Sequence, residues 1–227
     1  MPCFNPKPGW EERVHLSYSL IKNLLPSTAI GIILVNDGST QNIDERKIKI
    51  LQKEIDSFTY FSYQENKGKG YSLRLGIQHS EAPICIYTDV DFPYEEKSFI
   101  KVYNEVRNNN ANIVVGVRNA IYYDHVPQLR KIISKFLRWM IRNVFSIKIT
   151  DTQGGLKAFD KEGKRIFLQT TIDRYLFDLQ FVYLASKDQA IRIVPVEVEL
   201  KSDVAFSKMN PRILLTELLN FLRILRT

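Results

Sequence analysis

Short, continuous runs of apolar residues alternate with longer segments of helical periodicity along most of the chain. The apolar runs predict buried strands over residues 29–35, 59–63, 84–87 and 112–117. The segments around them predict helices over residues 11–25, 43–55, 69–79, 95–108 and 127–145. Continuous apolar strands separated by helices are typical of a mostly parallel sheet with helices on both faces. We therefore expect an α/β fold of this kind.

Acidic residues follow two of the predicted strands. Asp37 lies just beyond the strand over 29–35, and Asp89 and Asp91 follow the strand over 84–87. Because ligands of open parallel sheets bind at the carboxyl ends of the strands, we expect these carboxylates to be near neighbours. Two carboxylates one residue apart repel each other unless a cation joins them, and Mg²⁺ or Mn²⁺ prefers such oxygen ligands. The pair predicts a metal site, although such pairs also end strands simply as turn and cap formers.

A turn rich in lysine and glycine lies between these acids, at residues 66–70. Gly68 and Gly70 would let the backbone come close to a ligand, while Lys67 and Lys69 would meet negative charge at the start of a helix. The turn has neither the spacing of a P-loop nor that of a Rossmann glycine motif, which argues against an ordinary NTPase or dehydrogenase. A solvated loop explains the same residues.

Composition limits the cellular compartment and the kinds of partner that we expect for this chain. The chain has 227 residues, is 44% hydrophobic and carries a formal net charge of +7, which suits a folded domain with an anionic partner. Cys3 and Cys85 are too few for a disulfide framework, which favours a reducing, cytoplasmic setting. The sequence shows no secretory signal, and no apolar run approaches the roughly 20 residues that span a bilayer. We expect a soluble or peripheral protein.

Taken in order, the motifs resemble those of family 2 glycosyltransferases with the GT-A fold. The resemblance rests on the runs at residues 36–40 and 66–70, on Arg74 and Gly76, and on the Asp-x-Asp pair. Later motifs resemble the branch that glycosylates polyprenyl phosphates, to which dolichyl-phosphate glucose and mannose synthases belong. These motifs are Val115-Gly116-x-Arg118, Arg130 with Ser134, Asp-Thr-Gln-x-Gly-x-Lys-x-Phe at 151–159, and Phe177-Asp178 with Tyr183-Leu184-Ala185. The run at 151–159 is considerably more specific than any single Asp-x-Asp.

This resemblance implies transfer of a hexose from a nucleotide sugar, of the UDP-glucose or GDP-mannose type, to a polyprenyl phosphate. Asp89 and Asp91 would hold the Mg²⁺ or Mn²⁺ ion that bridges the donor's two phosphates. The residues expected around the nucleotide sugar are Pro2, Phe4, Asn5, Asp37, Lys69, Asp89 and Val90. Arg118, Arg130 and Ser134 would cradle the acceptor's phosphate, and the last two are four positions apart on a predicted helix, so they share one face. A solvated basic helix face explains them too.

The reaction itself decides whether a base is needed. The sugar becomes oxocarbenium-like while the diphosphate leaves with growing negative charge, which a metal and basic side chains stabilise. A single displacement inverts the anomeric centre. A phosphate acceptor is already an anionic nucleophile, whereas a sugar hydroxyl needs a general base, for which Asp178 is the candidate. A helix acid packed near a lysine explains Asp178 equally well, and Asp151 either acts in the site or braces the turn at Gly154 and Gly155.

The sequence departs from the family pattern at two places. Only Met1 precedes Pro2, where family members carry a hydrophobic first strand. We therefore expect a single catalytic domain over residues 1–227 in which the usual first strand is missing or the start is misplaced. Gln180 stands where relatives have the glutamate of Phe-Asp-x-Glu, and a neutral amide cannot take a proton.

Three further expectations concern partners. Residues 129–149 mix large apolar with basic side chains, which suits peripheral contact with the inner face of a membrane, although such a helix could also simply cover the sheet. The stretch over 212–226 is apolar almost all round, as in a core helix.

Two other functions stay open: transfer to a sugar hydroxyl of a surface polysaccharide, and a basic nucleic-acid-binding module. Aromatic residues are not interleaved with basic ones in any RNP-like run, so we expect no nucleic-acid partner.

Overall fold

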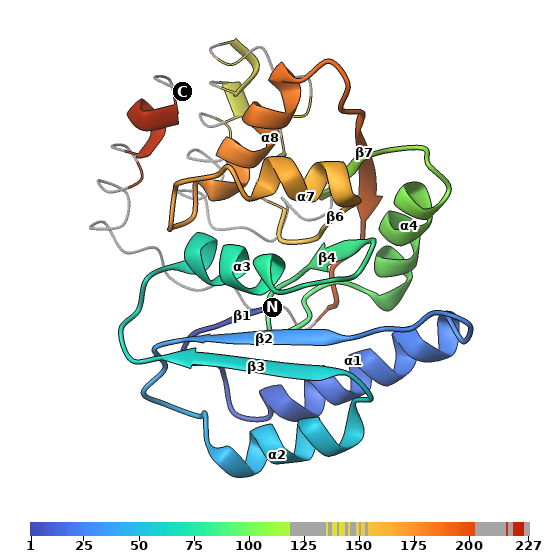
Figure 1. The fold of residues 1–227 in the computed structure, drawn as a ribbon, viewed down its shortest axis with the longest axis vertical. Helices are drawn as coiled ribbons and strands as arrows, with labels where there is room; N and C mark the ends of the chain where they lie inside the picture. Colours follow the sequence, from blue (N-terminus) through green and yellow to red (C-terminus); the bar gives the residue numbers. More distant parts are fainter. Residues whose placement is uncertain are drawn as a thin grey trace.

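The computed structural model describes residues 1–118, 135, 138–139, 141–143, 145, 149, 151–152, 154–202, 217 and 220–224. Strands and helices alternate along this part of the chain (Figure 1). The first elements are β1 (Pro2–Cys3), α1 (Trp10–Leu24), β2 (Ile32–Asp37), α2 (Glu45–Glu54), β3 (Phe58–Tyr63), α3 (Lys69–Gln78) and β4 (Cys85–Tyr87). They are followed by α4 (Glu96–Arg107), β5 (Ile113–Arg118), β6 (Lys157–Phe159), α7 (Lys161–Phe167), α8 (Phe177–Lys187) and β7 (Ile193–Val198).

The described strands form two sheets. The first has the order β1-β2-β3 and is parallel throughout, with Asp37 at the end of β2 opposite Tyr63 at the end of β3. The second has the order β4-β6-β5-β7, in which β5 and β7 are parallel and β6 runs antiparallel to both of its neighbours. The expectation of mostly parallel strands is confirmed, and β6 is the exception to it.

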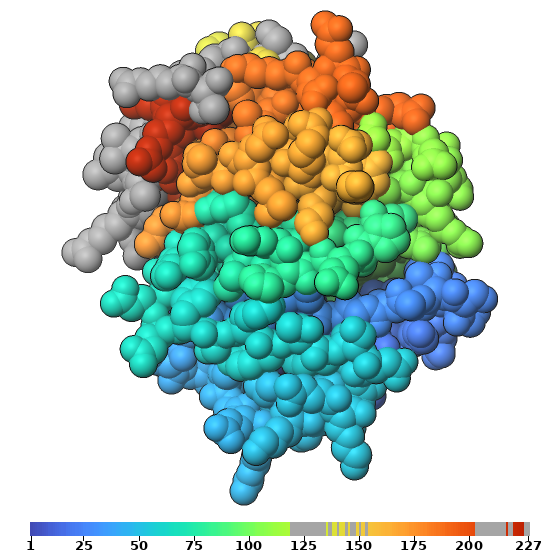
Figure 2. Space-filling view, viewed as in Figure 1, coloured from blue at the N-terminus to red at the C-terminus, as the bar shows by residue number. Residues whose placement is uncertain are grey.

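The described buried residues form two cores on opposite faces of the second sheet. Successive residues of β5 contribute to different cores, as the alternation of side chains in a strand requires. Ile113 and Val115 pack with residues of α3, α7 and α8, whereas Val114 packs with residues of α1, α2 and α4. The side chains of α3 and α7 cover one face side by side (Figure 2). Helices therefore lie on both faces, as expected.

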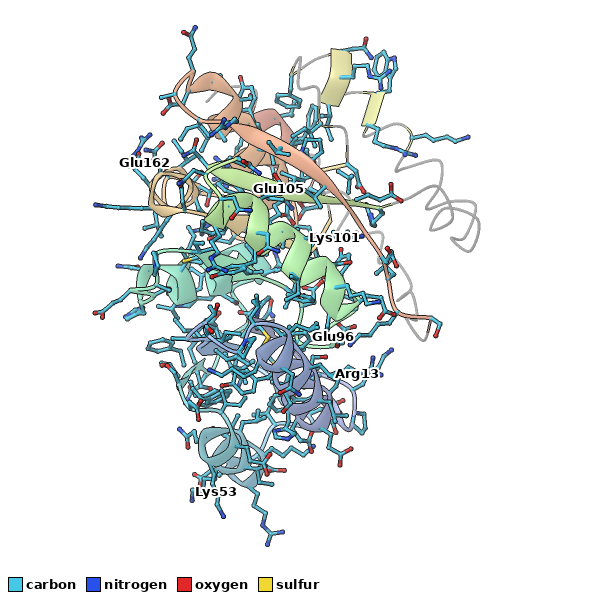
Figure 3. The ribbon with its side chains drawn as sticks, turned by 90° about the vertical axis from the view of Figure 1, so that its right-hand side faces the viewer. Arg13, Lys53, Glu96, Lys101, Glu105 and Glu162 are labelled. Atoms are coloured by element: carbon cyan, nitrogen blue, oxygen red, sulfur yellow. The ribbon has the colours of Figure 1, made fainter. Side chains whose placement is uncertain are left out.

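Helix α4 lies next to α1 on the opposite face (Figure 3). Glu96, at the start of α4, accepts a hydrogen bond from the Ser17 hydroxyl of α1 at 2.9 Å. The amine of Lys201 donates to the same carboxylate oxygen at 2.6 Å. This contact joins α1, α4 and the segment that follows β7.

The four predicted strands and the first four predicted helices are present. The largest difference in their ends is at β2, which is expected from residue 29 and begins at Ile32. The predicted helix over 127–145 and the apolar stretch over 212–226 lie largely outside the described residues. In the described part of the chain, no helix combines the length and the hydrophobicity that crossing a bilayer requires.

The start of the chain pairs with β2. Strand β1 consists of Pro2 and Cys3, opposite Val35 and Asn36. The Met1 carbonyl extends this pairing by accepting a hydrogen bond from the Val35 amide at 2.9 Å. The expectations of a missing or misplaced first strand and of one domain over residues 1–227 stay predictions.

Candidate functional site

A pocket of about 570 Å³ lies beside the ends of β1, β2 and β4. Its walls come from the loop between β1 and α1, the end of β2, the turn before α3, the segment after β4 and the turn before α8. All the residues expected around the nucleotide sugar and the metal line it: Pro2, Phe4, Asn5, Asp37, Lys69, Asp89, Val90 and Asp91. The carboxylates at the ends of β2 and β4 therefore share one pocket, as the strand-end argument predicts.

The Asp-x-Asp pair occupies the segment directly after β4. The carboxylate of Asp89 accepts a hydrogen bond from the Lys69 amine at 2.6 Å. Burial raises the pKa of Asp91, and the negative charge of Asp89 raises it further. Burial alone would lower the pKa of the Lys69 amine, but the charges of Asp89 and Asp178 outweigh it and raise that pKa. One lysine thus balances part of the charge of the acidic pair.

The oxygen atoms of this pair suit a hard divalent cation that takes its remaining ligands from a substrate. Asp89 and Asp91 offer carboxylate oxygens, the ligands that Mg²⁺ and Mn²⁺ prefer. Among the described residues, no group of three or more histidine, cysteine, aspartate or glutamate side chains is placed to hold a metal. A cation here would need further ligands from substrate phosphates or water, which is how Mg²⁺ is commonly bound. Burial and, to a smaller extent, repulsion from Asp89 raise the pKa of Asp91, and such a cation would relieve the repulsion.

Asp37 is buried and receives hydrogen bonds from the turn before α3. Four groups donate to its carboxylate: the Tyr63 hydroxyl at 2.8 Å, the Asn66 side-chain amide at 2.9 Å, and the backbone amides of Lys67 and Gly68 at 2.7 and 3.0 Å. These contacts fix the turn in place. The expected contact between Asp37 and the nucleotide sugar stays a prediction, and the protein itself fills most of the carboxylate's acceptor sites.

The glycines of this turn make room for another part of the chain. Gly68 has a φ of 108°, and a Cβ at this position would clash with the carbonyl oxygen of Asp173. That oxygen accepts hydrogen bonds from the backbone amides of Gly70 and Tyr71, at 2.7 and 3.2 Å. The start of α3 is therefore capped by the segment at residues 172–173. From the sequence, we expected a ligand rather than another part of the chain to approach these glycines. Lys69 still lines the pocket, as expected.

Arg118, at the end of β5, is engaged by Asp151. The Asp151 carboxylate accepts hydrogen bonds from the Arg118 backbone amide, Nε and Nη2, at 2.9, 3.0 and 2.5 Å. Burial would raise the pKa of Asp151, but the hydrogen bonds and charge of Arg118 outweigh it and lower that pKa. Asp151 therefore orients Arg118. The phosphate-binding role of Arg118 stays a prediction, and Arg130 and Ser134 lie outside the described residues.

Asp178 is buried at the start of α8. Its Oδ1 accepts hydrogen bonds from the Lys157 amine, at 2.5 Å, and from the Tyr87 hydroxyl. The Asp178 side chain is only 4% exposed and is not among the described residues that line the pocket. A general base must reach the proton that it removes, so this position favours the alternative of an acid packed against a lysine.

Gln180 has a structural function. It is buried, and its side-chain oxygen accepts hydrogen bonds from the backbone amides of Thr171 and Ile172, at 2.8 and 3.0 Å. The same residue thus holds the segment that caps α3. The neutral amide in place of the family's glutamate is therefore satisfied by backbone donors.

The pocket wall also contains residues that the sequence did not point to, among them two that come just before α8. Arg174 and Tyr175 precede α8 and line the pocket. Tyr175 is 50% exposed, and Phe4, which also lines the pocket, is 51% exposed. The signal that could have found them is their place directly before the Phe177-Asp178 motif.

Several curated proteins are similar in sequence to this chain. Dolichyl-phosphate beta-glucosyltransferase of Dictyostelium discoideum is 28% identical over 190 residues, which are 79% of this chain and 57% of that protein. The human protein of the same name is 27% identical over 198 residues, 82% of this chain and 60% of that protein. This chain therefore spans less than two thirds of the length of either relative. Their names agree with the branch that the motifs resemble.

Solved structures show the same fold. Mannosyl-3-phosphoglycerate synthase from Rubrobacter xylanophilus superposes with a TM-score of 0.66 and 12% identity, over 99% of this chain and 71% of that one. Glucosyl-3-phosphoglycerate synthase from Mycobacterium tuberculosis, in complex with Mn²⁺ and UDP-glucose, has a TM-score of 0.59 and 14% identity, over 94% and 71% of the two chains. The fold is the GT-A fold of glycosyltransferases.

The family is shown by the first three quarters of the sequence. The model of the family described as Glycosyl transferase family 2 matches residues 1–167. This match contains β1 to β6, α7 and both acids of the Asp-x-Asp pair. The chain therefore belongs to glycosyl transferase family 2.

Proposed function

We propose that this chain is the catalytic domain of an inverting glycosyltransferase that moves a hexose from a nucleotide sugar to a polyprenyl phosphate of the dolichyl type. The observation that carries the proposal is the shared pocket of Asp89, Asp91 and Lys69 at the strand ends. The similarity to dolichyl-phosphate beta-glucosyltransferases supports the choice of a lipid phosphate as acceptor.

Asp89 and Asp91 are the residues that would hold Mg²⁺ or Mn²⁺. The related structures from Mycobacterium tuberculosis and Pyrobaculum calidifontis contain Mn²⁺ together with UDP-glucose and GDP-mannose, respectively. When bound, the cation supplies positive charge that stabilises the departing diphosphate. Lys69 supplies positive charge of its own, because its amine lies within hydrogen-bond distance of Asp89 and lines the same pocket.

The reaction that we propose is a single displacement. A phosphate oxygen of the acceptor attacks the anomeric carbon while the bond to the diphosphate breaks, and the bonding electron pair leaves with the diphosphate. The acceptor oxygen is already anionic, so no proton has to be removed. A sugar hydroxyl would need a base, and the acids among the described lining residues are Asp37, Asp89 and Asp91. Hydrogen-bond donors of the protein occupy most of the acceptor sites of the Asp37 carboxylate, and the other two acids form the cation site. The pocket therefore favours a phosphate acceptor.

The acceptor would meet the enzyme at a membrane surface, since its phosphate is attached to a lipid. We propose that Arg118, Arg130 and Ser134 bind this phosphate and that residues 129–149 contact the membrane, at its cytoplasmic face. Asp151 orients the guanidinium of Arg118 by accepting hydrogen bonds from its Nε and Nη2. Arginine forks match phosphate oxygens in geometry, which makes this residue suited to the task.

The deciding experiment has two stages. Calorimetry with Mn²⁺ first compares UDP-glucose with GDP-mannose, and the Asp91→Asn variant serves as the control that lacks one cation ligand. The labelled donor that binds is then incubated with a polyprenyl phosphate or with a polysaccharide. Label on the lipid phosphate is the expected result. Label only on the polysaccharide would establish the hydroxyl acceptor instead, and salt-sensitive DNA binding without donor binding would establish a nucleic-acid-binding module.

A further inference from the structure

A buried ion pair joins β6 and α8. Lys157 on β6 has a fully buried side chain, and its amine is 2.5 Å from the carboxylate of Asp178 on α8. The hydroxyl of Tyr87 on β4 donates to the same oxygen, and the amine lies 5.3 Å from the centre of the Tyr87 ring. Burial lowers the pKa of the Lys157 amine, and the charge of Asp178 opposes this shift.

Such a pair needs a reason other than stability. A charge loses its hydration when it is buried, and apolar residues of similar volume often stabilise a protein as well as a buried ion pair does. The amine of this lysine also contacts the turn that precedes β6. The Lys157 amine donates a hydrogen bond to the carbonyl oxygen of Gly154, at 2.6 Å.

The turn at Gly154 and Gly155 lies against the acid that is proposed to bind the cation. The Gly155 amide donates to the Tyr94 hydroxyl at 2.8 Å. A Cβ on Gly155 would be 2.8 Å from Oδ2 of Asp89 and 3.7 Å from the Lys69 amine. A side chain at residue 155 would therefore have to displace the Asp89 carboxylate or move the turn away from it.

Two members of this buried cluster, Tyr87 and Lys157, are thus connected to Asp89. Tyr87 is two residues before Asp89 on the same strand end, and Lys157 reaches it through Gly154 and Gly155. We infer that Lys157 is a positioning residue, which holds this turn against Asp89 and so sets the geometry of the cation and donor site. Asp178 is the counter-ion that allows Lys157 to be buried. This inference rests on the proposed function, because the site that it positions is the donor site.

The experiment compares three variants with the unchanged chain. Lys157→Met and Asp178→Asn each remove one charge of the pair. The double variant removes both charges, while the introduced asparagine can still accept a hydrogen bond from Tyr87. Melting temperature and Mn²⁺-dependent binding of UDP-glucose and GDP-mannose are measured for each. Leu51→Ala is the matched control, because Leu51 is fully buried in α2 and does not line the pocket.

Each single variant is expected to melt lower than the double variant, because it leaves one buried charge without its partner. Donor affinity is expected to fall at least about tenfold in the double variant as well, since the hydrogen bond to Gly154 is still missing. Leu51→Ala should lower the melting temperature and leave donor affinity within about twofold. Gly155→Ala, which leaves the ion pair in place, should weaken donor binding to a similar extent.

Three results would overturn the inference. Donor affinity that recovers together with stability in the double variant would show that the pair only stabilises the fold. A variant Asp178→Asn that keeps its donor affinity but loses the acidic limb of the pH profile of kcat would show that Asp178 is a base. Failure of the unchanged chain to bind either nucleotide sugar with Mn²⁺ would refute the proposed function itself, and this inference with it.

Discussion

Replacing Asp151 by asparagine should show how strongly this acid holds Arg118. The carboxylate accepts three hydrogen bonds from Arg118, and the two side chains are only 11% and 15% exposed. Asparagine has almost the same shape but cannot balance the guanidinium charge. Breaking one partner of a largely buried ion pair costs about 3 kcal/mol. For a chain of this length, that loss lowers Tm by about 6–12 °C.

The pH dependence gives this prediction a second test. The pKa of Asp151 is lowered in the folded protein, so its stabilising contribution is complete above the ordinary aspartate pKa of 3.8 and is lost as the pH falls through the lowered value. The difference in stability between the original chain and Asp151→Asn should therefore be full at pH 7 and shrink in strong acid. Denaturant unfolding at both pH values measures this.

The matched control is Glu199→Gln. Glu199 pairs with Lys101 at 3.2 Å, but these side chains are 60% and 49% exposed, so this substitution should cost less than about 1 kcal/mol. Equal stability losses in Asp151→Asn and Glu199→Gln at pH 7 would refute the reasoning. A loss in Asp151→Asn that does not shrink in acid would show that packing, rather than charge, is what the substitution removes.

Three other substitutions test other parts of the site. Asp91→Asn should abolish most turnover with Mn²⁺, and unchanged activity would contradict the cation site. It should also raise the melting temperature of the metal-free protein at neutral pH, because the raised pKa of Asp91 means that its ionised form costs stability. Arg118→Lys should raise the KM for polyprenyl phosphate much more than the KM for the donor, since lysine lacks the fork, and parallel changes in both constants would argue against a phosphate contact. Gly68→Ala should destabilise the protein by more than Gly9→Ala in thermal unfolding, because both glycines have positive φ but only Gly68 also faces the Asp173 carbonyl, and similar losses would contradict this packing argument.

Strands with uninterrupted apolar runs were predictable, and strands that depend on distant partners were not. The run that contains β5 is apolar enough to be recognised without any knowledge of its neighbours. Strand β6 begins with Lys157, whose burial makes sense only because Asp178 lies beside it after folding. Strand β7 contains Pro195, which interrupts the usual strand pattern.

The same distinction holds for the site. The positions of Asp37, Asp89 and Asp91 at strand ends were enough to predict one shared pocket. The partners of Arg118 and of the turn before α3 are set by contacts between segments far apart in sequence. The place of Arg174 and Tyr175 before the Phe177-Asp178 motif connects them with the site, but their contribution to the wall depends on how the turn before α8 docks.

The cap that Asp173 places on α3 has a consequence for folding. It joins residues about 100 positions apart, so the pocket depends on a contact of long sequence separation, and such contacts form only after the entropy of closing a long loop has been overcome. Donor binding would then report completion of the native topology rather than formation of the first sheet. A fragment that ended after residue 167 would keep both acids of the Asp-x-Asp pair and lose Arg174 and Tyr175 from the pocket wall.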